Sequence, residues 1–168
     1  MAQTVTRQAL MPDGTDREFR VFVHEFLAFA DRLTAVRAAF AARIGLPGAG
    51  YTLLIALARL EAEAPGVAAL AAHLHVSTAH VTAEMARLQR GGFVRKRPHP
   101  SDGRRVVLSI TPAGRAALAR LAPIQAPVND ALFAALSADD FRCLAALLPR
   151  MVADGDAALG LLEREDAA

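Results

Sequence analysis

The sequence predicts a mainly α-helical protein in which a small central lobe carries a two-stranded hairpin and long helices flank the lobe. Hydrophobic residues make up 54% of the 168 residues, and Ala and Leu dominate among them, which favours helices over strands. Apolar residues recur at three- and four-residue steps near both ends of the chain, as amphipathic helices require. A short alternating segment between residues 93 and 110 is typical of strands.

The N-terminal segment, residues 1–14, is polar and aperiodic and is predicted to be disordered. Thr15 followed by Glu18 has the form of a capping box, which opens a helix over about residues 16–43. The apolar residues that recur at three- and four-residue steps along this helix are Phe19, Phe22, Val23, Phe26, Phe29, Leu33, Val36 and Phe40. The Gly-Leu-Pro-Gly sequence at residues 45–48 is expected to end it.

The centre of the chain is predicted to form three further helices. A mostly apolar helix is expected over about residues 49–63, followed by Pro65-Gly66. Two short helices, Val67 to Leu74 and Ser77 to Gln89, are separated by only two residues. Such a short connection is typical of a helix-turn-helix.

A hairpin is predicted directly after this pair of helices. Its strands are expected at residues 93–97 and 104–110, because Val106, Leu108 and Ile110 alternate with their neighbours. The connection from Pro98 to Gly103 consists of turn-forming residues. The order helix, helix, turn, helix and hairpin predicts a winged helix-turn-helix lobe over residues 49–112.

Two helices are expected after the hairpin. Thr111 is a good N-cap, and the helix after it is predicted to reach about Leu136, kinked or broken near Pro123 and Pro127. A last helix is expected from Ser137 to about Leu162. Both ends of the chain offer more apolar surface than the lobe can cover, so we expect a homodimer built by residues 15–48 and 113–168.

The charge is unevenly distributed. The net charge is +2, yet the nineteen residues from Arg87 to Arg105 hold seven Arg or Lys residues and the single acid Asp102. This window therefore carries +6, and the rest of the chain carries −4. A basic patch on an otherwise acidic chain predicts a polyanion partner, and double-stranded DNA suits a winged helix.

The helix that starts at Ser77 is the predicted recognition helix. Val81, Met85 and Leu88 form its inner face, whereas its outer face is small and basic, so it can enter a major groove. Ser77 exposes free backbone N–H groups to a phosphate, and Asp102 is expected to shape a hairpin tip whose Arg104 suits the minor groove. The predicted DNA-binding residues are Ser77, Thr78, Ala79, His80, Thr82, Ala83, Arg87, Arg90, Arg95, Arg97, Asp102, Arg104 and Arg105.

These residues resemble those of the MarR (multiple-antibiotic-resistance regulator) family of transcriptional regulators. The resemblance is carried by the run from Val76 to Thr82, by Leu88, by Gly92-Phe93-Val94, and by the run from Arg97 to Gly114, and the helix order agrees over about residues 16–162. It implies a dimer that binds a pseudo-palindromic operator and is released by a small effector. By position, Asp102 and Arg104 would be the wing pair and Ser77 to Thr82 the base-reading residues.

Two residues depart from the family pattern, and the effector-binding residues are less distinctive. Ala83 stands where a basic residue is frequent and His99 where an acid is frequent, which leaves the operator sequence open. Tyr51 aligns with a position that lines the family's effector pocket, and Arg32 could pair with a carboxylate there, so an aromatic acid or a phenol is expected. A tyrosine at the core edge and a surface arginine are the simpler interpretations of these two residues.

The alternatives to a repressor are a metal sensor, a redox sensor, an enzyme and an architectural DNA binder. A zinc-responsive regulator would use the histidines at positions 24, 73, 75 and 80 together with Cys143, but their spacing matches no metal motif. Cys143 lies among leucines and is expected to be a buried, inert thiol. No nucleophile or phosphate-loop motif predicts an enzyme, and no cofactor is expected. With one cysteine and no membrane-spanning run, a cytoplasmic location is expected. A non-specific architectural DNA binder stays an open alternative.

Overall fold

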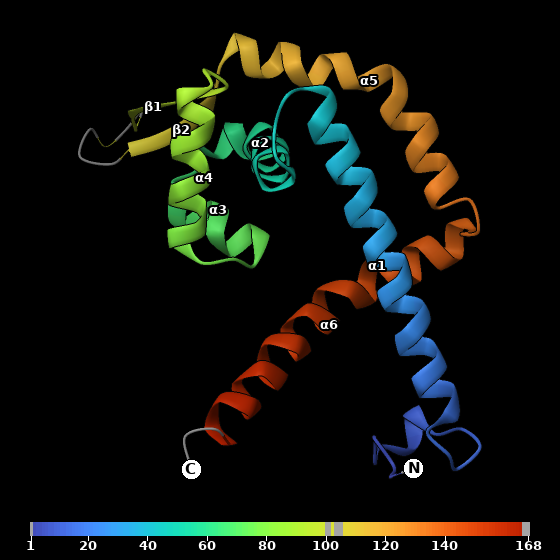
Figure 1. The fold of residues 1–168 in the computed structure, drawn as a ribbon. Coiled ribbons are helices and arrows are strands. Elements are labelled where there is room, and N and C mark those ends of the chain that lie inside the picture. Colours follow the sequence, from blue (N-terminus) through green and yellow to red (C-terminus); the bar gives the residue numbers. More distant parts are fainter. Residues whose placement is uncertain (1, 100–101, 103–105, 166–168) are drawn as a thin grey trace. The chain divides into compact units, whose positions relative to one another are not determined.

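The structure is a computed structural model that describes residues 2–99, 102 and 106–165 (Figure 1). It is 73% helical with one small antiparallel sheet, which confirms the predicted fold class. The elements in chain order are η1 (Gln8–Leu10), α1 (Arg17–Arg43), α2 (Gly48–Leu60), η2 (Glu61–Glu63), α3 (Val67–Leu74), α4 (Thr78–Arg90), β1 (Val94–Pro98), β2 (Val106–Ile110), α5 (Pro112–Leu132) and α6 (Ala138–Glu165). The chain divides into two compact units, residues 1–126 and 127–168.

The N-terminal segment differs from the disordered tail that the sequence predicts. It contains the 3-10 helix η1, and both the backbone N–H and the hydroxyl of Thr4 donate to Asp16 Oδ2, at 2.8 and 2.7 Å. The predicted capping box is replaced, because the Thr15 hydroxyl donates to Asp13 and Asp16 precedes the first helical residue. Asp16 also pairs with Arg20 across one helical turn.

Helix α2 lies at the centre of the first unit. It contacts α1, α3, α4 and β2, which is why almost every position of this short helix is apolar. The side chains of Tyr51, Leu53, Leu54 and Leu57 are at most 1% exposed. The burial of these side chains anchors α4 and the hairpin to the long N-terminal helix.

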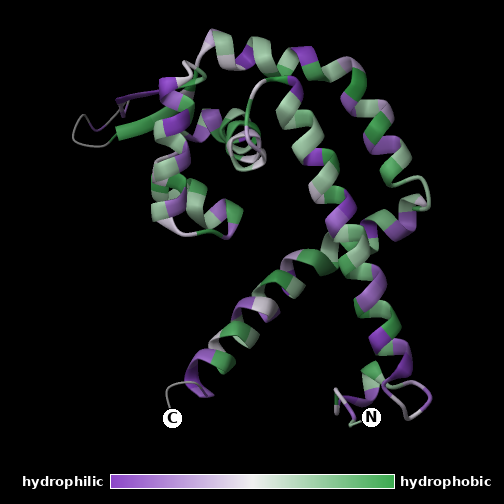
Figure 2. Cartoon of the chain, in the orientation of Figure 1, coloured by the Kyte–Doolittle hydropathy of each residue, from purple (hydrophilic) through white to green (hydrophobic). Residues whose placement is uncertain are grey.

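The predicted hairpin forms: β1 lies one residue further along the chain than expected and β2 ends at Ile110 as expected, while the predicted start of the second strand at residues 104 and 105 lies outside the described residues. β1 and β2 pair antiparallel, with Val94 opposite Ile110 and Pro98 opposite Val106. Figure 2 shows a hydrophilic β1 beside a hydrophobic β2. Residues 107–110 are all buried, on both faces of β2, and the Leu108 N–H donates to the Pro65 carbonyl at 2.9 Å. The residues of β2 alternate between two faces as predicted, but both faces are buried rather than one.

The base of the hairpin is fixed by Thr111. Its N–H donates to the Phe93 carbonyl at 3.0 Å and its hydroxyl donates to the Gly92 carbonyl at 2.6 Å. The same hydroxyl accepts from the Gly114 N–H at 3.1 Å, which confirms Thr111 as an N-cap. A Cβ on Gly114 would lie 2.3 Å from the Phe93 carbonyl oxygen, so only glycine allows this close approach.

Helix α5 is not broken at Pro123 or Pro127, and it ends at Leu132 rather than near Leu136. Each proline removes a backbone N–H and so frees one carbonyl, on Ala119 and on Pro123. Both of these residues are exposed, so water can satisfy the freed carbonyls.

Helix α6 begins with the capping arrangement expected at Ser137. The Ser137 N–H donates to Asp140 Oδ2 at 2.9 Å, and the Asp140 N–H donates to Ser137 Oγ at 3.2 Å. The helix continues through Pro149. Among the described residues no single helix has the length and apolarity to cross a membrane, and α1 meets these criteria only jointly with residues 48–63, from which it is bent by 84°.

Candidate nucleic-acid interface

Helix α4 is seated by one apolar face. Val81, Met85 and Leu88 are at most 2% exposed, and α4 contacts α2, α3 and β1. The residue before the helix, Ser77, has an extended backbone, and its hydroxyl accepts from the His80 N–H at 3.1 Å. The inner face and the N-cap predicted from the sequence are therefore both observed.

The outer face of α4 is shallow and solvent-exposed. Every residue predicted to contact DNA on this helix is exposed: Ser77, Thr78, Ala79, His80, Thr82, Ala83, Arg87 and Arg90. The Thr82 hydroxyl donates to the Thr78 carbonyl at 2.8 Å, so its lone pairs can still accept from a base edge. The turn before α4 is kept short by His75, which takes a left-handed conformation with φ of 52°.

The hairpin adds positive charge beside α4. It extends away from helices α2 to α4 (Figure 1), and Arg95, Lys96 and Arg97 are exposed along β1. Arg95 Nε donates to Ser109 Oγ at 3.4 Å, which links its side chain to β2. Asp102 is exposed, while Arg104 and Arg105 lie outside the described residues, so the predicted wing pair stays a prediction.

Glu84 is a residue of α4 that the sequence analysis missed. It is 4% exposed, and its carboxylate accepts from Arg87 Nη1 one turn further along the helix. A helical wheel places Glu84 at the edge of the inner face, next to Leu88, but a charged residue at such an edge is usually assigned to solvent.

The two residues predicted to bind an effector, Tyr51 and Arg32, lie in different environments. Tyr51 is 1% exposed, packs edge-on against Phe40, and its hydroxyl accepts from Gln125 Nε2 at 2.9 Å. Burial raises the pKa of Tyr51 above its ordinary value. Arg32 is exposed and donates to the Ala28 carbonyl of its own helix at 2.7 Å.

Arg37, and not Arg32, is the cation next to the tyrosine. Its guanidinium lies 5.4 Å from the centre of the Tyr51 ring, and Arg37 Nη2 donates to the Thr52 hydroxyl at 3.0 Å. A step of five residues carries Arg32 to a different face of α1, because a helix repeats every 3.6 residues. The cation–π contact holds the Arg37 guanidinium over α2.

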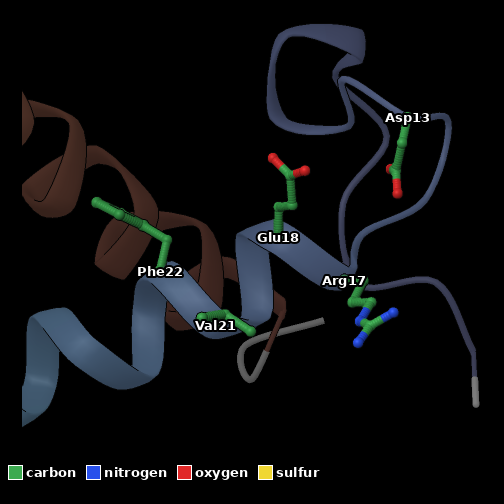
Figure 3. Close-up of a pocket in the computed structure, with 5 residues that line it drawn as sticks. All are labelled: Asp13, Arg17, Glu18, Val21 and Phe22. Carbon is green, nitrogen blue, oxygen red and sulfur yellow. The ribbon is translucent and has the colours of Figure 1, made fainter.

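Two open cavities lie along α1. One, of about 270 Å³, is lined by residues of α1 and of the start of α2: Thr34, Arg37, Ala38, Gly48, Ala49 and Thr52. The other, of about 460 Å³, is lined by Asp13, Arg17, Glu18, Val21 and Phe22; Figure 3 shows Asp13 on the preceding loop and the other four on the first turns of α1. The first cavity contains a partly buried guanidinium and two hydroxyls, so it is the better anion site.

The remaining candidates for metal or redox chemistry are dispersed. The described part of the chain contains no group of three His, Cys, Asp or Glu side chains placed to hold a metal ion. Cys143 is exposed, contrary to the buried thiol expected from its leucine neighbours, because that face of α6 carries no covering segment in its own unit.

A helix-turn-helix followed by a projecting basic hairpin and flanked by long helices defines a winged helix protein. The MarR family model matches residues 52–106, whereas no curated protein matches the chain. The resemblance seen in the sequence is thereby confirmed: residues 52–106 form a MarR-family domain.

Solved structures of MarR-family regulators share the fold well beyond that segment. Sco3205 from Streptomyces coelicolor, a MarR family transcriptional regulator in complex with DNA, is 26% identical with a TM-score of 0.68, over 83% of this chain and 91% of that one. MepR from S. aureus, in a DNA complex, is 14% identical with a TM-score of 0.69, over 79% and 95%. BpsR from Bordetella bronchiseptica, whose DNA binding is regulated by 6-hydroxynicotinic acid, is 22% identical with a TM-score of 0.63, over 77% and 91%.

Proposed function

We propose that this chain is a homodimeric, sequence-specific DNA-binding repressor, acting in the cytoplasm, that a small anionic effector releases from its operator. The observation that carries the proposal is the exposed outer face of α4, rich in small residues, next to the exposed cations of β1. Sco3205 and MepR, which share the fold, have been solved in complex with DNA. Members of the family are transcription regulators, and the proposal assigns no catalytic residue to this chain.

In the proposed complex α4 enters the major groove. Ala79 and Ala83 let the helix backbone approach the bases, while Thr78, His80 and Thr82 contact base edges. The free N–H groups behind Ser77 and the cations Arg87 and Arg90 face phosphates. Arg95 and Arg97 bind the backbone beside the groove, and Asp102, Arg104 and Arg105 act at the hairpin tip.

The proposed dimer is supported by apolar surface that each unit leaves open. On α1 the exposed residues include Val21, Phe22, Phe26 and Leu27, and on α6 they include Phe141, Leu148, Leu159 and Leu162. Such surfaces on a monomer mark an interface, and a two-fold dimer is its commonest form. We assign residues 15–48 and 113–168 to dimerisation and residues 49–112 to the DNA-binding lobe. Two symmetric lobes would present their α4 helices about one DNA turn apart.

The effector is proposed to bind in the cavity between α1 and α2. Arg37 can pair with a carboxylate through two parallel N–H bonds, and Thr34 and Thr52 add hydroxyls. A volume of about 270 Å³ is at the small end of ligand sites, which favours a one-ring aromatic acid. This assignment keeps the chemistry predicted from the sequence but replaces Arg32 with Arg37.

The proposal is tested by fluorescence anisotropy with duplex DNA from directly upstream of the gene, with competitor DNA and a salt series. We expect specific binding, and Arg97→Ala should weaken binding to all sequences alike and lower the salt slope by about 1. Arg142→Ala, which removes an exposed cation from α6, is the matched control and should bind as the wild type. Absence of binding in dilute buffer contradicts the proposal, and equal affinity for competitor DNA supports an architectural binder instead.

The effector site is tested by adding benzoate, salicylate or 6-hydroxynicotinate to the same assay. At least one acid should release the DNA from the wild type, and Arg37→Gln should abolish the release while keeping DNA affinity. Arg32→Gln is the matched control and should respond as the wild type. Release that survives in Arg37→Gln contradicts the site, and metal analysis of the purified protein tests the zinc alternative.

A further inference from the structure

We propose that Glu84 is a positioning residue for DNA binding: its buried carboxylate holds the guanidinium of Arg87 at the edge of the outer face of α4. Glu84 points into the lobe, with a side chain 5% exposed, whereas the Arg87 side chain is 60% exposed. Arg87 Nη1 donates to Glu84 Oε1. The inference rests on the proposed function and adds a residue that does not itself touch DNA.

The burial of Glu84 needs a physical reason. A carboxylate is removed from water only at a substantial free-energy cost unless partners compensate it. Among the described residues Oε2 has no hydrogen-bond partner, so Glu84 is compensated by the bond of Oε1 to Arg87. An apolar side chain between Val81 and Leu88 would avoid the cost, and we infer that the acid contributes to binding rather than to folding.

The geometry explains what that contribution is. On a 100° wheel Glu84 lies at the edge of the inner face, and Arg87 lies between it and the outer face formed by Ala83 and Arg90. A guanidinium has five N–H donors in a rigid fork. One of them is committed to Glu84, so the others are held toward the surface on which the DNA is proposed to lie.

Pre-organisation of this kind affects affinity. A free arginine side chain loses rotamer entropy when it binds a phosphate, and a side chain that is already ordered loses less. Electrostatics alone predicts the opposite effect of Glu84, because a carboxylate close to DNA repels phosphates. The two explanations therefore predict changes of opposite sign when the charge of Glu84 is removed.

The test is the DNA-binding assay on Glu84→Gln, Arg87→Ala and the double variant. We expect Glu84→Gln to weaken specific binding about 3- to 10-fold, the effect of ordering one free arginine on binding, although the chain becomes more positive. In the Arg87→Ala background the same change should have no weakening effect. Arg87→Ala should lower the salt slope by about 0.9, the value for one lost phosphate contact, and Glu84→Gln should lower it partly.

The controls separate this inference from stability and from the proposed function. Asp139→Asn removes an acid from another i, i+3 pair with an arginine, Arg142 on α6, and should leave the affinity unchanged. Unchanged or tighter binding by a folded Glu84→Gln overturns the inference, whereas a wild type that ignores DNA overturns the proposed function itself. If Glu84→Gln does not fold, Arg87→Lys decides: the positive charge remains but the fork is lost, and binding equal to wild type refutes the positioning role.

Discussion

Replacement of Gly114 by alanine should destabilise the lobe although alanine is the better helix former. The added Cβ would lie 2.3 Å from the Phe93 carbonyl oxygen and 2.7 Å from Ile110 Cγ1. Ile110 is fully buried, and the Phe93 carbonyl is held by the Thr111 N–H at 3.0 Å. Neither neighbour can retreat without loss of packing or of a hydrogen bond.

The magnitude follows from three opposing effects. Overpacking of this severity costs about 3 kcal/mol, and loss of one backbone hydrogen bond adds about 1 kcal/mol. The higher helix propensity of alanine offsets about 1 kcal/mol. We therefore expect about 3 kcal/mol of destabilisation, which corresponds to a fall in Tm of about 6–12 °C for a chain of this size.

Thermal unfolding followed by circular dichroism, together with urea unfolding, measures this effect. Gly155→Ala on α6 is the matched control, because a Cβ there meets nothing within 4 Å, and it should leave Tm unchanged or slightly raised. A Gly114→Ala protein that melts with the wild type or above it would refute the close approach at the hairpin base.

Three further predictions concern the core and two titrating groups. Leu54→Ala should cost about 2–5 kcal/mol in chemical denaturation, because Leu54 is fully buried in α2, and a loss below 1 kcal/mol would contradict its central place. Hydrogen bonds from Thr4 and the charge of Arg20 lower the pKa of Asp16. Protection of the Thr4 amide from hydrogen exchange should therefore persist above about pH 4 and fall as Asp16 is protonated below its ordinary pKa of about 3.9. Unchanged protection at pH 2 would contradict the contact between Thr4 and Asp16. Since burial raises the pKa of Tyr51, the only tyrosine, the midpoint of its ultraviolet titration should lie above that of a free tyrosine. The folded state should lose stability as the pH rises from the ordinary tyrosine pKa through that raised pKa. A midpoint at the ordinary pKa would show an exposed ring.

The sequence predicted burial best where the residues of one helix face all pack against the same neighbours. The inner face of α4 is visible in the spacing of Val81, Met85 and Leu88, because each of them is buried by the same neighbours. The Thr111 cap was likewise predictable, since it depends on residues three positions apart. Glu84 shows the limit of this reasoning, because a charged residue on an apolar face is usually assigned to solvent.

Contacts between distant segments were not predictable from patterns. Thr4 binds Asp16 twelve residues away, and no local rule selects one polar residue of a tail as the partner. Which arginine of α1 lies beside Tyr51 depends on how α1 is rotated against α2, and the sequence pattern does not distinguish Arg32 from Arg37 in this respect. The end of α5 at Leu132 was also not predictable, because residues 133–136 contain no glycine or proline that would mark a helix end.

The hairpin base has a mechanical consequence for regulation. Thr111 ties the end of β2 to the residues just before β1, and the Leu108 N–H ties the middle of β2 to Pro65, at the entrance to α3. These hydrogen bonds couple the hairpin to the segments that precede α3 and β1. In the proposed repressor, an effector that changes DNA affinity would therefore move α4 and the hairpin together, so that both would leave their grooves in one step.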